Sequence, residues 1–585
     1  MSEGDRKRNE KFEKYEAMNE EMLSRTDSEN APWHIVEAVD RRFATVKIYS
    51  IAAETLERQI EAVEKKSEHS RDRAEEEKEP KDNGKEEMKL TESILAKADL
   101  SLSYTKEEYE KKLKKLQKRI EKLHGELYRK RIPVVLAFEG WDAGGKGGAI
   151  KRLTAKMDPR GYVVHPTASP NAVERQYHYL WRFWRSMPKA GHIAVFDRTW
   201  YGRVMVERIE GFCTEEEWRR AYKEINDMER NLTKEGVLIL KFWMQIDKKE
   251  QTRRIEKLNK EQDTKWRVDA FDKWQNEHYK HCQKIFDRYL TDTNTSIAPW
   301  YIIDAKDRNF VELQVLEIMV SNIEVALQNS THSAPLLPNI FPLEKMPKLS
   351  EIELTDKVIE DEEYKKELKH LQKKLGELHN RLYRKRVPVI ITYEGWDAAG
   401  KGGNIKRITE ALDPRGFEVH PIASPEPHEK ARHYLWRFWT RLPKDGHIAI
   451  FDRTWYGRVM VERLEGFCSE NDWKRAYNEI NEFEKELSDW GAVIIKFWVQ
   501  IDKDTQLARF TDRQNNPEKQ WKITDEDWRN REKWDAYECA VDEMLAKTST
   551  TYAPWHILES VDKKYARIKA LKIVIKELEK ALERT

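Results

Sequence analysis

The stretch LYRKRVPVIITYEGWDAAGKGGNIKRI, residues 382–408, decides the fold of the second half of the chain. It passes from helical periodicity into a short apolar strand, then a glycine-rich loop, then a second helical stretch. The loop has the spacing G-x-x-x-x-G-K. Its glycines let backbone N–H groups close on phosphate oxygens, while the lysine and the helix N-terminus add positive charge. The order of strand, glycine loop and helix predicts a P-loop.

The same pattern occurs twice. Residues 127–153 read LYRKRIPVVLAFEGWDAGGKGGAIKRL, and AGHIAVFDRTWYGRVMVERIEGF at 190–212 returns as DGHIAIFDRTWYGRVMVERLEGF at 445–467. The offset is 255 residues both for the lysines, 401 minus 146, and for the aspartates, 452 minus 197. A register held over this length indicates two copies of one fold.

A partial third copy opens the chain. Residues 7–48 match residues 531–571, including APWHIV against APWHIL. The first residues are therefore predicted to be the tail of a third domain whose catalytic core is absent. A docking piece and a remnant of duplication both fit this pattern, and we favour the remnant.

Apolar runs alternate with helical stretches in each copy. In the second copy these runs are VPVIITYE, FEVHPI, HIAIFD, GAVIIKFWVQ and APWHIL. Near-continuous apolar strands between helices indicate a parallel sheet covered on both faces. We expect an α/β chain of two tandem P-loop kinase-like α/β/α domains. The expected boundaries are a partial tail at 1–67, a charged linker at 68–90, a first domain at 91–330, a proline-rich linker at 331–349 and a second domain at 350–585.

Composition narrows the function classes. Lys and Arg total 107 and Asp and Glu 105, for a net charge of +2. Any affinity for a polyanion must then come from local clusters, which argues against a nonspecific nucleic-acid binder. Four cysteines without a CxxC pair fit a reducing cytoplasm. No signal peptide and no membrane span is indicated, so a cytoplasmic protein is expected.

The P-loop departs from the usual motif in one position. The Ser or Thr that normally follows the lysine and binds Mg²⁺ is replaced by Gly147 and Gly402. A phosphotransferase still needs a metal on the transferred phosphate, so other oxygens must supply it. The candidates are the loop aspartates and the strand-end aspartates of the two copies: Asp142, Asp197, Asp397 and Asp452. The alternative for the loop aspartates is that they cap the following helix.

Basic residues follow the strand-end aspartates. Arg453 and Arg458 in the second copy, and Arg198 and Arg203 in the first, suit the stabilisation of phosphoryl charge. They could instead be paired surface arginines.

A further basic cluster lies in LARFTDRQNNPEKQWKITDEDW, residues 507–528. It is predicted to be a lid over the polyanion, formed by Arg509, Arg513, Lys519 and Lys522. A solvated charged face is the alternative.

These motifs together resemble the polyphosphate kinase 2 family, and the tandem form is similar to polyphosphate:AMP phosphotransferases. The resemblance covers roughly 88–330 and 343–585 plus the tail. It implies polyphosphate as phosphoryl donor, AMP as acceptor, ADP as product, Mg²⁺ as the required ion and a tendency to form homo-oligomers. Phosphate binding would fall to Gly395, Gly400, Lys401, Gly402 and Gly403, with Gly145, Lys146 and Gly147 as first-domain counterparts. Asp397, Asp452 and Arg453 would carry the catalytic roles.

The two copies differ in the lid. Leu258 stands opposite Arg513, and beyond this point we expect a three-residue slip that aligns Tyr279 with Tyr537. The resemblance to the tandem enzymes implies that the C-terminal half is the one expected to carry activity. The sequence therefore predicts a competent second domain and a weak or structural first one.

Other functions stay open at this stage. The acceptor could be ADP or GDP, and the donor could be ATP, although the missing Ser/Thr argues against ATP. A non-catalytic polyphosphate scaffold would not need the metal carboxylates. Nucleic-acid binding through the aromatic and basic residues of 433–444 is disfavoured, because such aromatics more often form core.

Overall fold

The computed structural model describes residues 11–26, 33–67, 93–262, 264–265, 268–328, 340–517, 520, 523 and 525–584. The chain divides into two compact units, Met1–Glu79 and Pro80–Thr585. The predicted linker at 68–90 and residues 331–339 of the proline-rich linker lie outside the described residues. No described helix combines the length and apolar character needed to cross a bilayer.

The first unit contains helices α2 (Phe12–Thr26) and α3 (Arg41–Ser67), with an extended segment before α3. Its local structure matches the end of the second domain. Lys47 pairs with Glu37 at 2.5 Å, as Lys569 pairs with Glu559 at 2.6 Å. The packing differs, because Trp33 is 52% exposed, whereas Trp555 in the matching APWHIL segment is 4% exposed.

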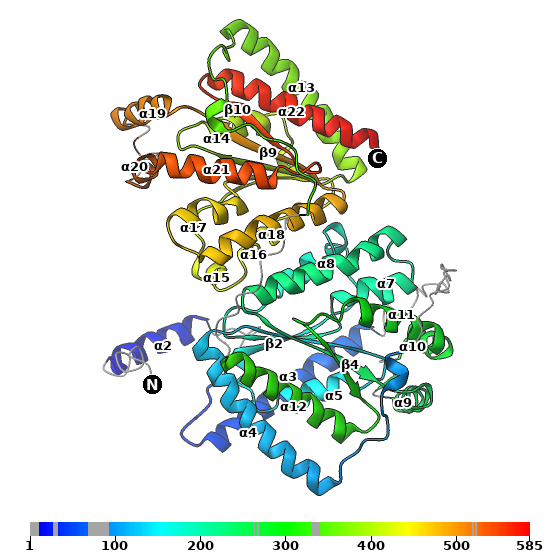
Figure 1. Cartoon of the computed structure of the whole chain (residues 1–585). Coiled ribbons are helices and arrows are strands. Elements are labelled where there is room, and N and C mark those ends of the chain that lie inside the picture. The colour runs from blue at the N-terminus through cyan, green and yellow to red at the C-terminus, as the bar shows by residue number, and fades with distance from the viewer. Residues whose placement is uncertain are drawn as a thin grey trace. The chain divides into compact units, whose positions relative to one another are not determined.

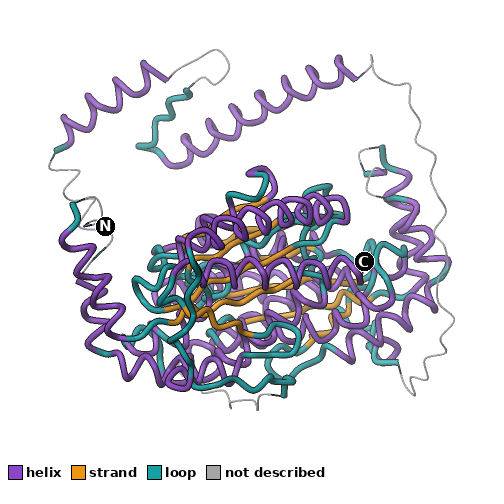
Figure 2. The backbone as a smooth tube through the Cα atoms, turned by 90° about the horizontal axis from the view of Figure 1, so that it is seen from above, coloured by secondary structure: helices purple, strands orange, loops and turns teal. Residues whose placement is uncertain are grey.

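The second unit contains two parallel five-stranded sheets with helices on both faces (Figures 1 and 2). The strand orders are β2-β3-β1-β4-β5 and β10-β9-β6-β8-β7. The first sheet comprises β1 (Val134–Gly140), β2 (Tyr162–Pro166), β3 (Ile193–Asp197), β4 (Leu238–Gln245) and β5 (Trp300–Asp304), and the second β6 (Val389–Gly395), β7 (Phe417–Pro421), β8 (Ile448–Asp452), β9 (Val493–Gln500) and β10 (Trp555–Glu559). The predicted α/β class with two parallel sheets is confirmed.

The helices repeat in the same order in the two halves, except that the counterpart of α15 is a 3₁₀ turn at Glu174–Gln176. The first half has α4 (Lys106–Lys130), α5 (Lys146–Thr154), α6 (Trp181–Arg185), α7 (Val206–Ile209), α8 (Glu215–Lys234), α9 (Lys248–Lys260), α10 (Ala270–Glu277), α11 (Tyr279–Asp292) and α12 (Arg308–Gln328). The second has α13 (Asp361–Lys385), α14 (Lys401–Thr409), α15 (Pro427–Lys430), α16 (Trp436–Trp439), α17 (Val461–Leu464), α18 (Glu470–Asp489), α19 (Lys503–Asn515), α20 (Asp525–Glu532), α21 (Trp534–Thr548) and α22 (Lys563–Arg584).

The central strand of each sheet leads into the P-loop. β6 lies between β8 and β9, and nearly all of its side chains are buried. The strand order reverses at this point, and in open parallel sheets ligands bind beyond the carboxyl ends of the strands at such a reversal. The fold therefore places both predicted phosphate loops at the usual ligand-binding edge.

A buried ion pair braces the segment that follows β8. Lys496 of β9 and Glu484 of α18 are both fully buried, and their charged atoms lie 2.7 Å apart. The same carboxylate accepts hydrogen bonds from Trp455 Nε1 at 3.1 Å and from the Tyr456 hydroxyl at 2.6 Å. This network fixes the D-R-T-W-Y-G-R segment against the sheet, and the first domain repeats it with Lys241 and Glu229.

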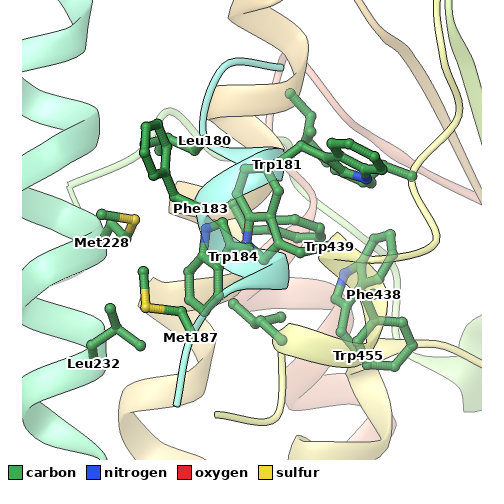
Figure 3. Packing of buried hydrophobic residues seen from close by; sticks show 14 of the residues in the cluster. Leu180, Trp181, Phe183, Trp184, Met187, Met228, Leu232, Phe438, Trp439 and Trp455 are labelled. Atoms are coloured by element: carbon green, nitrogen blue, oxygen red, sulfur yellow. The ribbon is translucent and has the colours of Figure 1, made fainter. Parts of the chain in front are cut away.

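The two domains pack against each other with approximate twofold symmetry. Trp184 of α6 and Trp439 of α16, which are 255 residues apart, stack at 5.5 Å (Figure 3). On either side, Ala190 N–H donates to Ala431 O at 2.7 Å and Asp445 N–H donates to Gln176 O at 2.8 Å. The two donors are equivalent residues of the two domains, and so are the two acceptors. Each bond is therefore the symmetry mate of the other, as in a symmetric dimer. Trp439 is 1% exposed, so this aromatic of 433–444 is core, as expected.

One position breaks this symmetry. Glu235 of the first domain accepts hydrogen bonds from Arg458 at 2.8 Å and from Arg475 at 2.5 Å. Its equivalent in the second domain, 255 residues on, is Trp490, whose ring lies edge-on to His178 at 6.2 Å. An ion-pair cluster on one side of the symmetry axis therefore corresponds to an aromatic contact on the other.

Candidate functional site

The P-loop of the second domain begins at a glycine that tolerates no side chain. A Cβ on Gly395 would lie 2.6 Å from the carbonyl oxygen of Val499 on the neighbouring strand. The loop closes at Gly400, whose φ of 112° places it in the left-handed region just before α14 begins at Lys401. Gly140 and Gly145 repeat both features in the first domain. The glycine spacing thus has a steric cause at each end of the loop.

The loop lysines fold back across their own loops. Lys401 Nζ donates to the carbonyl oxygens of Gly395 at 2.7 Å and Trp396 at 3.3 Å. Lys146 makes the equivalent bonds to Gly140 at 3.1 Å and Trp141 at 3.5 Å. The ammonium group thus lies over the loop. A bound phosphate group would replace the carbonyl oxygens as its partner.

A buried glutamate, Glu394, joins the P-loop to the segment after β8. Its carboxylate accepts hydrogen bonds from both the backbone N–H and the hydroxyl of Thr454, each at 2.7 Å. Burial raises the pKa of Glu394, and the hydrogen bonds from Thr454 oppose this shift. The neighbouring Arg453 has a φ of 67°, an uncommon conformation for a residue with a side chain. The first domain repeats the arrangement through Glu139, Thr199 and Arg198.

The strained arginine reaches the loop aspartate. Arg453 Nη2 lies 3.3 Å from Asp397 Oδ1, and the side-chain amide of Asn530 donates to Asp397 Oδ2 at 3.0 Å. Asp452 is the end residue of β8, in register with Tyr393 of β6. The structure therefore brings Lys401, Asp397 and Arg453 to one edge of the sheet, with Asp452 adjoining Arg453. In the first domain Arg198 and Asp142 are 2.9 Å apart.

Arg509, expected in the lid, supports the P-loop backbone. Its guanidinium donates to Ala398 O and Ala399 O, each at 3.0 Å, and to Ser560 O at 2.5 Å. Arg513 lies one turn further along α19. Lys519 and Lys522 lie outside the described residues.

The structure does not bring Arg458 to this group. Its guanidinium pairs with Glu462 and with Glu235 of the first domain, and its side chain is 11% exposed. Arg203 likewise pairs with Glu207 at 3.2 Å and is 15% exposed. Arg458 thus contributes to the packing of the two domains, and Arg203 pairs within its own domain, so the structure does not bring either arginine to the P-loop group.

The expected three-residue slip between the copies is wrong. Trp534 stacks on Trp396 at 3.6 Å, and Tyr279 stacks on Trp141 at 3.9 Å, so the partner of Tyr279 is Trp534, 255 residues on. The sequence alone does not distinguish the two registers, because each places an aromatic residue opposite Tyr279, and only the packing identifies the correct one. The corrected register pairs Gln275 with Asn530, and both contact the loop aspartate of their domain.

The first-domain site opens into a cavity of about 990 Å³ lined by the loop from Asp142 to Ala149 and by Asp197 and Arg198. Leu258 lines this cavity where the second domain has Arg513. Burial and the nearby charge of Asp142 raise the pKa of Asp272 to about 7. The first domain therefore keeps the loop but has Leu258 in place of a lid cation, whereas Asp272 has its counterpart in Asp527, 255 residues on.

Sequence reasoning missed several residues of the site. Glu394 is the clearest, because the identical E-G-W-D in both copies could have pointed to it. Asn530 and Trp534 were not recognised because the assumed slip concealed their counterparts.

Comparison with known proteins agrees with this geometry. The family described as Polyphosphate kinase 2 matches residues 1–66, 103–331 and 358–585. The chain belongs to the polyphosphate kinase 2 family. The matched ranges include the tail segment as well as both P-loop domains.

Relatives of known name match most of this chain. The chain is 38% identical to a polyphosphate:AMP phosphotransferase of Pseudomonas aeruginosa, over 84% of this chain and 100% of that protein. It is 37% identical to one of Acinetobacter johnsonii, over 76% of this chain and 90% of that protein. A crystal structure of a polyphosphate kinase 2 from Pseudomonas aeruginosa PA01 superimposes with a TM-score of 0.74 at 36% identity, covering 84% of this chain and all of that one.

Proposed function

We propose that the chain transfers a phosphoryl group from inorganic polyphosphate to AMP, which yields ADP and a polyphosphate shortened by one unit. Family membership and relatives named polyphosphate:AMP phosphotransferase support the substrates. The observation that carries the chemistry is the convergence of Lys401, Asp397 and Arg453 at the end of the central strand.

The reaction requires one bond exchange at phosphorus. A phosphate oxygen of AMP attacks the terminal phosphorus of polyphosphate in line, and the bond from that phosphorus to its bridging oxygen breaks. The electron pair leaves on the shortened polyphosphate. Positioning and charge neutralisation supply the catalysis, so no covalent enzyme intermediate is required.

The chain's own residues divide this work. Lys401 and the N–H groups of the loop bind the phosphate oxygens, with Gly400, Gly402 and Gly403 leaving space for close approach. Arg453 neutralises charge that develops on the transferred group. Glu394 and Thr454 hold Arg453 at its position, as their paired 2.7 Å hydrogen bonds indicate.

The donor set fits Mg²⁺. Within the described ranges no group of three or more His, Cys, Asp or Glu side chains is placed to hold a metal. Mg²⁺ is usually bound by one or two carboxylates, with substrate phosphates and waters completing the shell. Asp397 and Asp452 would provide those oxygens in place of the missing P-loop Ser/Thr. The bound ion would supply charge neutralisation on the phosphoryl oxygens.

We further propose that the second domain carries the turnover. The first domain has Leu258 in place of Arg513, as described above. Its loop is otherwise intact, so the difference lies in the charges around the loop.

The test is a donor–acceptor assay with matched loop variants. Polyphosphate and Mg²⁺ are offered with AMP, ADP, GMP or GDP, and the products are separated by chromatography. ADP from AMP, lost in Lys401→Ala and kept in Lys146→Ala, supports both proposals. ATP formed from ADP without AMP turnover would change the acceptor. Loss in Lys146→Ala alone would assign the turnover to the first domain.

A further inference from the structure

A cavity of about 120 Å³ lies where the two P-loop domains pack against each other. We call it the interdomain cavity. Its apolar wall includes Trp184, Met187 and Leu232, which are labelled in Figure 3. No residue of either P-loop, all of which the structure describes, is among those that line it. The volume is large enough for several water molecules or for one compact anion, so the cavity is a possible binding site separate from both phosphate loops.

Three cations line the interdomain cavity, Arg131 from the first domain and Lys430 and Arg432 from the second. Among the described residues, no carboxylate forms an ion pair with any of the three. Arg432 is partly buried, and this burial lowers its pKa without an acid to oppose the shift. Its guanidinium donates only to backbone oxygens, Nε to Met187 O at 3.2 Å and Nη1 to His428 O at 2.7 Å. A guanidinium with neutral partners keeps donors available for an anion.

The packing of the domains holds these cations around one space. The N–H of Ala190 donates to Ala431 O at 2.7 Å, between Lys430 and Arg432 in the sequence. The bond from Arg432 Nε to Met187 O crosses the same boundary. Both bonds join the first domain to the second, so the position of the cations depends on the two domains together.

The one acid among the described residues that line the cavity already has cationic partners. Glu235 accepts hydrogen bonds from Arg458 at 2.8 Å and from Arg475 at 2.5 Å. Two guanidiniums on one carboxylate more than neutralise its charge. The charges of the three lining cations are therefore not compensated by this acid.

The equivalent place on the other side of the symmetry axis is built differently. Trp490 stands in place of Glu235, so an indole ring takes the place of a shorter side chain. Tyr177 stands in place of Arg432 and stacks on a neighbouring tryptophan ring at 3.9 Å. That side therefore has larger side chains and lacks the partly buried guanidinium.

An acid also distinguishes the two sides. Arg386 is the counterpart of Arg131, and Asp445 stands where the first domain has Ala190. Burial raises the pKa of Asp445 to about 6, and the charge of Arg386 opposes this shift. The protein thus supplies Arg386 with a nearby carboxylate, whereas Arg131 has an alanine at the equivalent position.

We propose that the interdomain cavity is an anion site that takes a phosphate or diphosphate ion, held by Arg131 of one domain and by Lys430 and Arg432 of the other. The ion supplies the negative charge that Asp445 supplies on the other side. Because it contacts both domains, its binding stabilises their packing. The proposal does not rest on the proposed function, since none of the three cations takes part in phosphoryl transfer.

The test measures anion binding to the full chain with both loop lysines replaced, Lys146→Ala with Lys401→Ala, which weakens the two P-loop sites. Calorimetry with inorganic phosphate and with diphosphate shows one site per chain, and the melting temperature rises with the concentration of the ion. Adding Arg432→Gln or Ala190→Asp weakens this binding at least about tenfold. Ala190→Asp places beside Arg131 the acid that the other side has.

Two matched variants serve as controls. Ala190→Asn has nearly the shape of Ala190→Asp without its charge, and it keeps the binding within about twofold. Asp445→Ala, the reciprocal change on the other side, also keeps it. Melting temperatures without anion show that each variant is folded.

Three outcomes would overturn the proposal: no binding of either ion to the parent chain, binding to Ala190→Asp as tight as to the parent, or equal losses in Ala190→Asp and Ala190→Asn. The assay measures binding and not turnover. Its result therefore stands apart from that of the donor–acceptor assay.

Discussion

Replacing Thr454 with valine tests how the site holds Arg453. The threonine hydroxyl donates to Glu394 at 2.7 Å and accepts from the N–H of Tyr456 at 3.2 Å, and the residue is 4% exposed. Valine keeps the shape and removes both bonds. Loss of a hydrogen bond to a carboxylate costs about 1.5–3 kcal/mol, and loss of the cap about 0.5–2 kcal/mol. We expect a destabilisation of about 3 kcal/mol.

The first domain offers a matched control in Thr199. Its hydroxyl makes the same two bonds, at 2.7 Å to Glu139 and 3.2 Å from Tyr201, and it is 2% exposed. Thr199→Val should therefore cost a similar free energy of unfolding. Only Thr454→Val should displace Arg453 from the reacting phosphate. If about 1.4 kcal/mol of the free energy lost in Thr454→Val is also lost in the transition state, kcat falls roughly tenfold.

Initial rates of ADP formation and urea unfolding curves provide the two readouts. Agreement requires similar shifts of the urea midpoint in the two variants and a fall in kcat only for Thr454→Val. An equal fall of kcat in Thr199→Val, or an unchanged kcat in a destabilised Thr454→Val variant, would refute the reasoning.

Three further outcomes follow from the packing. Lys496→Met leaves Glu484 buried without its cation, so urea unfolding should show a loss of about 3–5 kcal/mol, and an unchanged midpoint would contradict the role of this pair. Burial lowers the pKa of His433 from 6.5 to about 4, so its stabilisation is present above pH 6.5 and is lost as the pH falls toward 4, by up to about 3 kcal/mol. A pH series of melting temperatures checks this, since His433→Gln should flatten that acid limb. Deleting residues 1–67 should reduce binding of a hydrophobic dye while AMP turnover is kept, because that segment exposes apolar side chains such as Trp33; turnover lost with the deletion would assign the segment a catalytic role.

The strands, the P-loops and their position could be predicted from the sequence because each depends on local pattern. An apolar strand followed by glycines at fixed spacing restricts the backbone to few conformations, and the repeat at 255 residues supplied the domain count. Glu394 was within reach of the same reasoning, because both copies keep it before the loop. Its role became clear only when the sheet placed Thr454 beside it.

Features that depend on contacts between distant segments could not be predicted. From the sequence alone Arg458 is predicted to be catalytic, and only the packing of the two domains shows that it pairs with Glu235. The alignment around Tyr279 depended on which aromatic ring stacks on the loop tryptophan, which spacing does not reveal. Glu312 and Arg567 are residues of opposite charge at equivalent positions of the two domains. They lie on helices far along the chain from the P-loops.

The broken symmetry at Glu235 and Trp490 has a consequence for how copies of this chain associate. A pair of second domains would present Trp490 to Arg458 and Arg475, which would withdraw the carboxylate that now receives both guanidiniums. A pair of first domains would instead bring Glu235 to Arg203 and Arg220, the counterparts of those arginines. The asymmetry therefore disfavours an interface between two second domains, whereas an interface between two first domains would keep a cationic partner for each Glu235.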